Sequence, residues 1–140
     1  MFVTTMIQPK WPFAAHAVIE TAAALSFIFR PEGQLPGCSP AARLILRQYG
    51  GLLLATNLVC VAVLLEPGFG SLCRAVTAAL ATYHAWPCYR AYVRLRLSSI
   101  STLGDSRKAR STFGGPAVHL VVHLVCFVMF VSAAVFGDDS

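Results

Sequence analysis

Four apolar stretches alternate with shorter polar stretches along this chain. They cover about residues 11–29, 44–65, 72–90 and 116–136. A helix that crosses a bilayer needs roughly 20 largely apolar residues, because the hydrocarbon core is about 30 Å thick. The pattern therefore predicts an all-α fold, an antiparallel bundle of four transmembrane helices.

Prolines and glycines set the expected ends of these helices. Pro12 stands early in the first segment, and Pro31 follows its end. The linker at residues 30–43 is rich in proline and glycine and is expected to be a loop. Pro87 is expected to break the third helix near its end, and residues 91–115 are expected to form a basic loop.

The first apolar segment could also be a cleaved signal peptide. Such a peptide has a basic start directly before a compact apolar core. Here nine residues and Lys10 precede the segment, and Glu20 interrupts its apolar core. We therefore expect an uncleaved transmembrane helix.

Composition supports a single integral membrane domain over residues 1–140. Hydrophobic residues make up 56% of the chain, charged residues 12%, and the mean hydropathy is +0.66. These values lie outside the range of soluble globular domains. With 140 residues, the chain is long enough for four membrane-spanning helices and little else.

The basic residues are distributed unevenly between the two sides of the predicted bundle. The loops after the first and third helices, with the adjoining helix ends, hold nine of the 11 Lys and Arg residues: Arg30, Arg43, Arg47, Arg90, Arg94, Arg96, Arg107, Lys108 and Arg110. Only Lys10 and Arg74 lie on the other side. The positive-inside rule then places the basic loops in the cytosol and both termini on the non-cytosolic side.

This topology accounts for the net charge of +5. The basic loop can face anionic lipid head groups, and no nucleic-acid partner is expected. We expect a multi-pass protein of the endoplasmic reticulum or the plasma membrane.

The five cysteines include no CxxC pair. Membrane thiol oxidoreductases depend on closely spaced redox cysteines. We therefore expect these cysteines to be small buried hydrophobes.

Polar residues inside the apolar segments are the candidate functional residues, because an ionisable group at membrane depth is costly. All four histidines lie in such segments, and Glu20 is the only acid well inside one, with His16 one helical turn before it. The depth of each side chain in the membrane can be estimated by counting 1.5 Å per residue from the expected helix ends. The estimates fall at one shared depth and at a second depth nearer the cytosol. At the shared depth lie Glu20, Asn57, His84 and His123, and at the second lie Arg47, Tyr49, Tyr83 and His119. His16 falls nearer the opposite side, and Gly50 and Gly51 would allow close helix packing.

Such a cluster favours acid/base chemistry on a lipophilic small molecule, for example isomerisation, cyclisation or epoxide opening. Desolvation favours the neutral, protonated form of a carboxylic acid, so Glu20 would supply a proton. His84 or His123 would accept one. Asn57, Tyr83 or Arg47 would orient a substrate oxygen, and Tyr49 and His119 would line the same substrate-binding site. No cofactor is needed for this chemistry.

Other interpretations stay open. Zinc could be held by His84, His119, His123 and Glu20, or haem by His84 and His123 on facing helices. The protein could instead be a non-catalytic scaffold or carrier that binds partners through its arginine-rich loop, and its polar residues could serve only as interhelical hydrogen bonds. A second copy of the chain could complete a shallow cavity, so a homo-oligomer also stays open.

Four motifs follow one another along the chain. They are an H-x-x-x-E pair at residues 16–20, RQYGGLLLATN at 47–57, ATYHAWP at 81–87 after Arg74, and an H-x-x-x-H pair at 119–123. In this order the chain resembles small four-helix membrane proteins of the DoxX-like type. The resemblance implies a four-helix bundle and membrane residence, and it does not imply an activity.

Two looser likenesses bear on activity. The chain is similar to small integral membrane proteins that accompany fungal biosynthetic enzymes, whose membrane-embedded cyclases and isomerases use buried acids. It is also similar to membrane glutathione transferases in size, helix count and basic charge. Their arginine- and glutamate-rich second-helix pattern is absent, with only Arg47 and Asn57 in its place.

Overall fold

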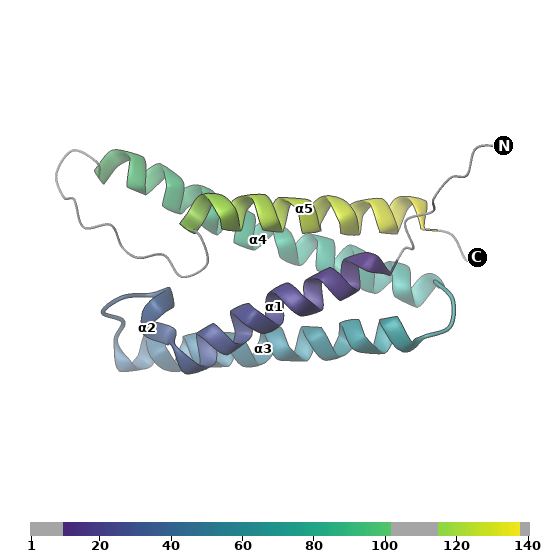
Figure 1. Ribbon diagram of the computed structural model, residues 1–140, viewed down its shortest axis with the longest axis horizontal. Helices are drawn as coiled ribbons and strands as arrows, with labels where there is room; N and C mark the ends of the chain where they lie inside the picture. The colour runs from purple at the N-terminus through teal and green to yellow at the C-terminus, as the bar shows by residue number, and fades with distance from the viewer. Residues whose placement is uncertain (1–9, 102–114, 138–140) are drawn as a thin grey trace.

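The fold is all-helical throughout the part that the computed structural model describes, residues 10–101 and 115–137 (Figure 1). Its helices are α1 (Trp11–Phe29), α2 (Pro31–Gln34), α3 (Pro40–Leu65), α4 (Ser71–Ser101) and α5 (Gly115–Phe136). No strand occurs within those two ranges. The predicted all-α class is therefore confirmed.

Local sequence explains where the helices begin and end. The residue before a proline is disfavoured in the α conformation, and Arg30, which precedes Pro31, leaves the helical region with φ −133° and ψ 54°. The Ser39 hydroxyl accepts a hydrogen bond from the Ala42 amide at 3.2 Å and caps α3. After α3, Gly68 adopts φ +77°, which a side chain would disfavour, and the chain turns toward α4.

Several predicted boundaries were wrong. The third long helix does not end near residue 90 but continues to Ser101, so the first part of the predicted basic loop is helical. Pro87 lies inside α4 and does not end it, because the arginines and leucines that follow favour helix. α3 begins at Pro40 rather than near residue 44, and the linker before it contains α2. The rest of the predicted loop, 102–114, lies outside the described residues.

The long helices form two pairs. α1 packs along α3, and α4 packs along α5, whereas α1 and α5 share fewer contacts (Figure 1). Consecutive long helices run in opposite directions along the long axis of the molecule (Figure 1). The two pairs cross, so residues of α1, α4 and α5 can meet in the middle of the structure.

Apolar packing is concentrated in two clusters. The larger one combines residues of α1, α3, α4 and α5 with the α3–α4 turn: Phe13, Cys60, Val63, Phe69, Cys73, Leu80, Ala81, Phe130 and Ala133. Within it Phe13 and Phe130 meet edge to face, with ring centroids 5.3 Å apart. The smaller cluster holds Ala24, Phe27 and Leu53. Along α1, His16 and Glu20 lie between the residues that belong to the two clusters.

The cysteines occur as free thiols. Cys38, Cys60, Cys73 and Cys126 are buried, and Cys88 is partly buried. Cys60 and Cys73 belong to the larger apolar cluster. Cys60 and Cys73 therefore pack as small hydrophobic residues, as the sequence predicted.

Burial is inverted relative to a soluble protein. Large apolar side chains such as Val18, Leu58 and Leu72 are more than 70% exposed, while His16, Glu20 and His84 are at most 1% exposed. Among the described residues, α1, α3 and α5 are long and apolar enough to cross a membrane. These features indicate a membrane protein.

α4 is not among the helices apolar enough to qualify as a span. It carries several polar side chains, including Arg74, Tyr83, His84 and Arg90. Crossing of the membrane by α4 therefore stays a prediction.

Candidate functional site

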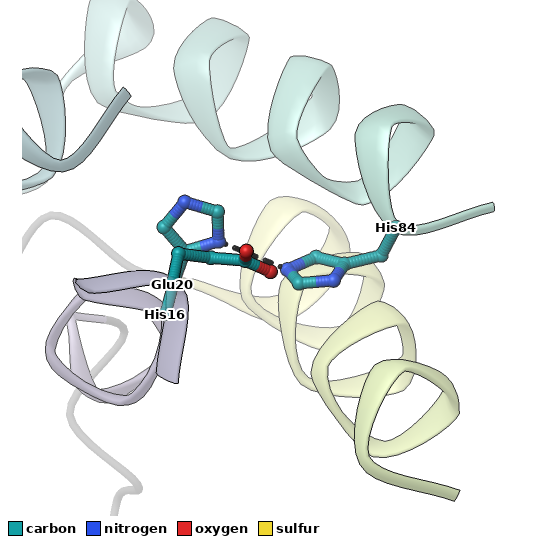
Figure 2. Close-up of side chains that lie close together, drawn as sticks. All are labelled: His16, Glu20 and His84. Carbon is teal, nitrogen blue, oxygen red and sulfur yellow. Dashed lines mark hydrogen bonds between the residues drawn. The ribbon is translucent and has the colours of Figure 1, made fainter. Parts of the chain in front are cut away.

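The site begins with two side chains on one face of α1. His16 and Glu20 are one helical turn apart, so both point toward the other helices, and both are buried. Nδ1 of His16 lies 3.0 Å from Nε2 of His84 on α4. Figure 2 shows the Glu20 carboxylate beside these two imidazoles. The crossing of α1 and α4 thus brings two histidines and one acid together.

A third imidazole extends this contact to α5. Nδ1 of His123 lies 3.0 Å from Nδ1 of His84, and His123 is only 6% exposed. Phe130 stacks against the His84 ring, with centroids 5.5 Å apart, and Tyr83 meets the His16 ring edge to face. Aromatic packing therefore holds a row of three hydrogen-bonded imidazoles from three helices.

Thr56 on α3 fixes the direction of these hydrogen bonds. Its hydroxyl donates to the Leu53 carbonyl at 2.7 Å, so its oxygen is left to accept from Nε2 of His16, at 3.5 Å. A neutral imidazole has one donor and one acceptor, so Nδ1 of His16 accepts. In neutral rings, Nε2 of His84 then donates to His16, and Nδ1 of His123 donates to His84.

Glu20 has an unsatisfied oxygen at the edge of this row. Its Oε1 is buried and has no hydrogen-bond partner among the described residues. The nearest imidazole nitrogen of His123 is 3.6 Å away, which is too long for a hydrogen bond. Buried polar atoms are nearly always paired, so this oxygen points to a proton, an ion or a ligand that the site binds.

A cavity of about 250 Å³ lies beside the row of imidazoles. Its wall is largely apolar and includes Ile19, Ala22, Ala23, Phe27, Pro87, Val118 and Val122. Its polar lining consists of Glu20, Gln34, Tyr49, Tyr83, Arg90, His119 and His123. The hydroxyls of Tyr49 and Tyr83 are 3.3 Å apart, which links α3 to α4 at this wall.

Most of the predicted site residues meet here. Glu20, His123, Tyr49, Tyr83 and His119 line the cavity, and His84 joins Glu20 and His123 as the middle imidazole. The sequence therefore identified the residue types and the helices that contribute to this site.

Two predicted substrate-binding residues lie elsewhere. Asn57 is buried but donates to Thr21 Oγ1 at 2.8 Å and is not part of the cavity lining. Arg47 is exposed and also lies outside the lining. Counting residues along a helix gave a depth for both, but it did not give the face on which each side chain lies.

His16 is the main residue that the predicted site omitted. The depth estimate set it apart from the other histidines, yet it contacts His84 directly. The estimate was wrong because the helices cross at an angle (Figure 1), so equal distances from helix ends do not give equal positions in space. The one-turn spacing of His16 and Glu20 was the signal that could have found it.

Arg90 was also missed as a site residue. From the sequence, Arg90 was counted among the basic residues on the cytosolic side and was not assigned to the site, but it lines the cavity. Its guanidinium lies 5.7 Å from the centre of the Phe27 ring. Stacking on this aromatic ring keeps a positive charge at the cavity wall.

The arrangement of the histidines differs from the ones predicted for zinc and for haem. Ligand atoms of His16, Glu20 and His84 all lie within 4.8 Å of one another, whereas the predicted zinc set contained His119 and His123 instead of His16. His84 and His123 touch each other through their ring nitrogens. A porphyrin does not fit between two rings in direct contact, so haem does not suit this pair.

Compared with known protein families, with curated proteins and with solved structures, the chain shows no match. The resemblance to DoxX-like proteins stays a prediction. The functional argument therefore rests on the site itself.

Proposed function

We propose that this chain is a four-span membrane enzyme that transfers protons to and from a lipophilic small molecule held in the cavity. The observation that carries the proposal is the buried, unpartnered Oε1 of Glu20 in the wall of an apolar cavity, 3.6 Å from His123. The substrate class, the reaction and the fourth span all belong to this proposal.

Packing of α4 supports the fourth span. α4 lies along α5, an apolar helix long enough to cross a membrane. Its Leu80 and Ala81 lie in the same apolar cluster as Phe13 of α1. A helix that packs in this way lies alongside its apolar neighbours, and its buried His84 is covered by them rather than by lipid. Such shielding is how membrane proteins accommodate polar side chains.

The cavity lining supports a small lipophilic substrate. The surface of its wall is largely apolar, with isoleucine, valine, alanine and phenylalanine side chains in the lining, and binding pockets for small molecules combine such walls with a few placed polar groups. Among the polar groups of the lining, Glu20 lies 3.6 Å from His123, and the Tyr83 hydroxyl lies 3.3 Å from that of Tyr49. A largely apolar molecule with one oxygen function would match this arrangement.

Glu20 and His123 suit the two halves of a proton transfer. A buried carboxylic acid can deliver a proton to an alkene or an oxygen, and a neutral imidazole can remove one from a neighbouring carbon. Isomerisation, cyclisation and epoxide opening each need one donor and one acceptor. Tyr83, with its hydroxyl near that of Tyr49, would orient the substrate oxygen.

Loss and rescue of a metabolite test this function. Cells that lack the protein would be compared with cells that express the wild type, Glu20→Gln or His123→Ala, and their lipid-soluble metabolites analysed by mass spectrometry. We expect the wild type to restore a product, and both variants to accumulate normally in membranes without restoring it.

Glu66→Gln is the matched control, because Glu66 is an exposed carboxylate at the far end of α3. It should restore the product fully. If the Glu20→Gln and His123→Ala proteins also restored it, the acid/base proposal would be wrong.

The scaffold interpretation makes a different prediction. It requires the basic residues Arg107, Lys108 and Arg110, which lie outside the described residues, to bind a partner. Replacing them with glutamine should then remove a co-purifying protein and leave the cavity residues unaffected. The enzyme proposal expects these substitutions to leave the product unchanged.

A further inference from the structure

We propose that His16, Glu20 and His84 form a binding site for a divalent transition-metal ion, with zinc the ion best suited to these donors. One imidazole nitrogen from each histidine and a carboxylate oxygen of Glu20 all lie within 4.8 Å of one another. The three residues come from two crossing helices and are at most 1% exposed. Figure 2 shows the three side chains converging on one point. The proposal goes beyond proton transfer and does not depend on it.

The spacing of the donor atoms fits a tetrahedral ion. Zinc binds imidazole nitrogen at about 2.0–2.1 Å, so two ligand atoms on one ion are about 3.4 Å apart. Nδ1 of His16 and Nε2 of His84 are 3.0 Å apart. Small side-chain rotations would bring both nitrogens and the carboxylate oxygen to ligand distance. Two histidines and one glutamate are a donor set that zinc enzymes use.

The outer nitrogens of both histidines already have partners that would orient them as ligands. A metal-bound histidine usually donates its other ring N–H to a nearby acceptor. Nε2 of His16 faces Thr56 Oγ1, whose own proton goes to the Leu53 carbonyl. Nδ1 of His84 faces Nδ1 of His123, which can accept once His84 turns its other nitrogen to the ion.

Glu20 supplies the charge that such an ion needs. A dication in apolar surroundings requires an anionic ligand, because desolvation of an unpaired charge is very costly. Oε1 of Glu20 is buried and lacks a hydrogen-bond partner among the described residues. An ion between the carboxylate and the two imidazoles would satisfy this oxygen, which the hydrogen bonds within the rest of the cluster do not.

Three protein ligands leave one position of a tetrahedral ion for water or a substrate oxygen. Glu20 belongs both to this trio and to the cavity wall, so a molecule in the cavity can reach that position. With the ion bound, Glu20 is a ligand and Nδ1 of His123 accepts from His84, so the proton transfer proposed for Glu20 and His123 belongs to the metal-free protein.

Metal binding by the full-length protein tests the site directly. The protein would be purified in detergent, its affinity tag removed, its metals stripped with a chelator, and Zn²⁺ or Co²⁺ added back. We expect one ion per chain by elemental analysis after dialysis, and a visible absorption band for the Co²⁺ form. Glu20→Gln, His16→Ala and His84→Ala should each abolish stoichiometric binding. Thr56→Val, which removes the partner of His16, should weaken it about 10- to 100-fold.

His119→Ala is the control that separates this site from the alternative set of histidines. His119 lines the cavity but does not belong to the trio, so its removal should leave one ion per chain. Circular dichroism and size-exclusion chromatography would show that each variant is folded, and the near-isosteric Glu20→Gln protein guards against loss of binding through misfolding. Substoichiometric binding by the folded wild type, or retained binding in Glu20→Gln, would overturn the site.

The two proposals fail in distinguishable ways. A metal-free protein that still makes its product would remove the metal site and leave proton transfer. A protein that binds one ion, but whose Glu20→Gln and His123→Ala variants both restore the metabolite, would keep the metal site and remove the proposed reaction.

Discussion

Thr56 shows how one hydroxyl can order a row of side chains from other helices. Its proton is committed to the Leu53 carbonyl, so its oxygen can only accept, and the direction of each following bond is set as far as His123. The hydroxyls of Tyr49 and Tyr83 make a contact between α3 and α4, two helices that otherwise share little packing. Single polar contacts therefore contribute to joining the two helix pairs.

The tyrosine pair can be tested by a double-mutant cycle. Tyr49→Phe and Tyr83→Phe should each lower the free energy of unfolding by about 0.6–2 kcal/mol, the usual range for a hydrogen bond between membrane helices. The double variant should lose less than the sum of the two single losses, because the bond between the two hydroxyls is removed by either substitution. Unfolding in mixed detergent and dodecyl sulfate micelles, followed by circular dichroism, measures these differences.

Tyr89→Phe is the matched control for this cycle. Tyr89 is 63% exposed, so removal of its hydroxyl should leave the unfolding curve unchanged. Fully additive losses in the Tyr49 and Tyr83 double variant would contradict a direct bond between the two hydroxyls.

At the level of elements, the contact between α1 and α3 depends on one glycine. A Cβ atom added at Gly50 would lie 2.7 Å from Cγ1 of Ile28 and 2.9 Å from the Ala24 carbonyl oxygen. At Gly51, nothing lies within 4 Å of such an atom. Close approach was predicted for both glycines, and it occurs at Gly50.

Adjacent alanine substitutions test this contact. Gly50→Ala should lower the free energy of unfolding by about 1–3 kcal/mol, the usual cost of overpacking, because the backbone of α1 would have to move away. Gly51→Ala should leave stability unchanged or raise it slightly, since alanine favours helix over glycine. Thermal unfolding of both proteins in the same detergent makes the comparison. Equal destabilisation by both would mean that α1 and α3 do not approach at Gly50.

The sequence predicted where the helices lie along the chain better than it predicted which side chains on each helix face make contacts. Runs of apolar residues and flanking prolines placed α1 and α5 within a residue, because both signals act locally. The end of α4 was missed because Pro87 removes one hydrogen bond without overriding the helix formers after it. The contact of His16 with His84 was missed because it depends on the angle at which two helices cross, which is set by packing among residues distant in sequence.

At the scale of the whole molecule, positive charge is concentrated at one end. Arginines of the described chain lie where α1 and α4 end and where α3 begins: Arg30, Arg43, Arg47, Arg90, Arg94 and Arg96. Within residues 10–101 and 115–137, the basic residues at the other end are Lys10 and Arg74. If four helices cross, the positive-inside rule places the arginine-rich end in the cytosol.

Glycosylation mapping tests this orientation and the fourth span together. Acceptor sites would be added at the N-terminus, at the C-terminus or within residues 102–114, and each protein translated in the presence of microsomes. Four spans predict glycosylation at both termini and not within 102–114. If α4 did not cross, the termini would lie on opposite sides, and only one terminal site would be modified.

The apolar wall of the cavity has a consequence for how kinetics would be measured. Ile19 and Ala22 on α1 and Val118 and Val122 on α5 contribute to it, and these two helices share few contacts. A lipophilic molecule that enters between them comes from the acyl chains rather than from water. Its effective concentration would then be its mole fraction in the membrane or micelle. Adding detergent at constant total substrate would dilute the substrate and slow the proposed reaction without any change in the protein.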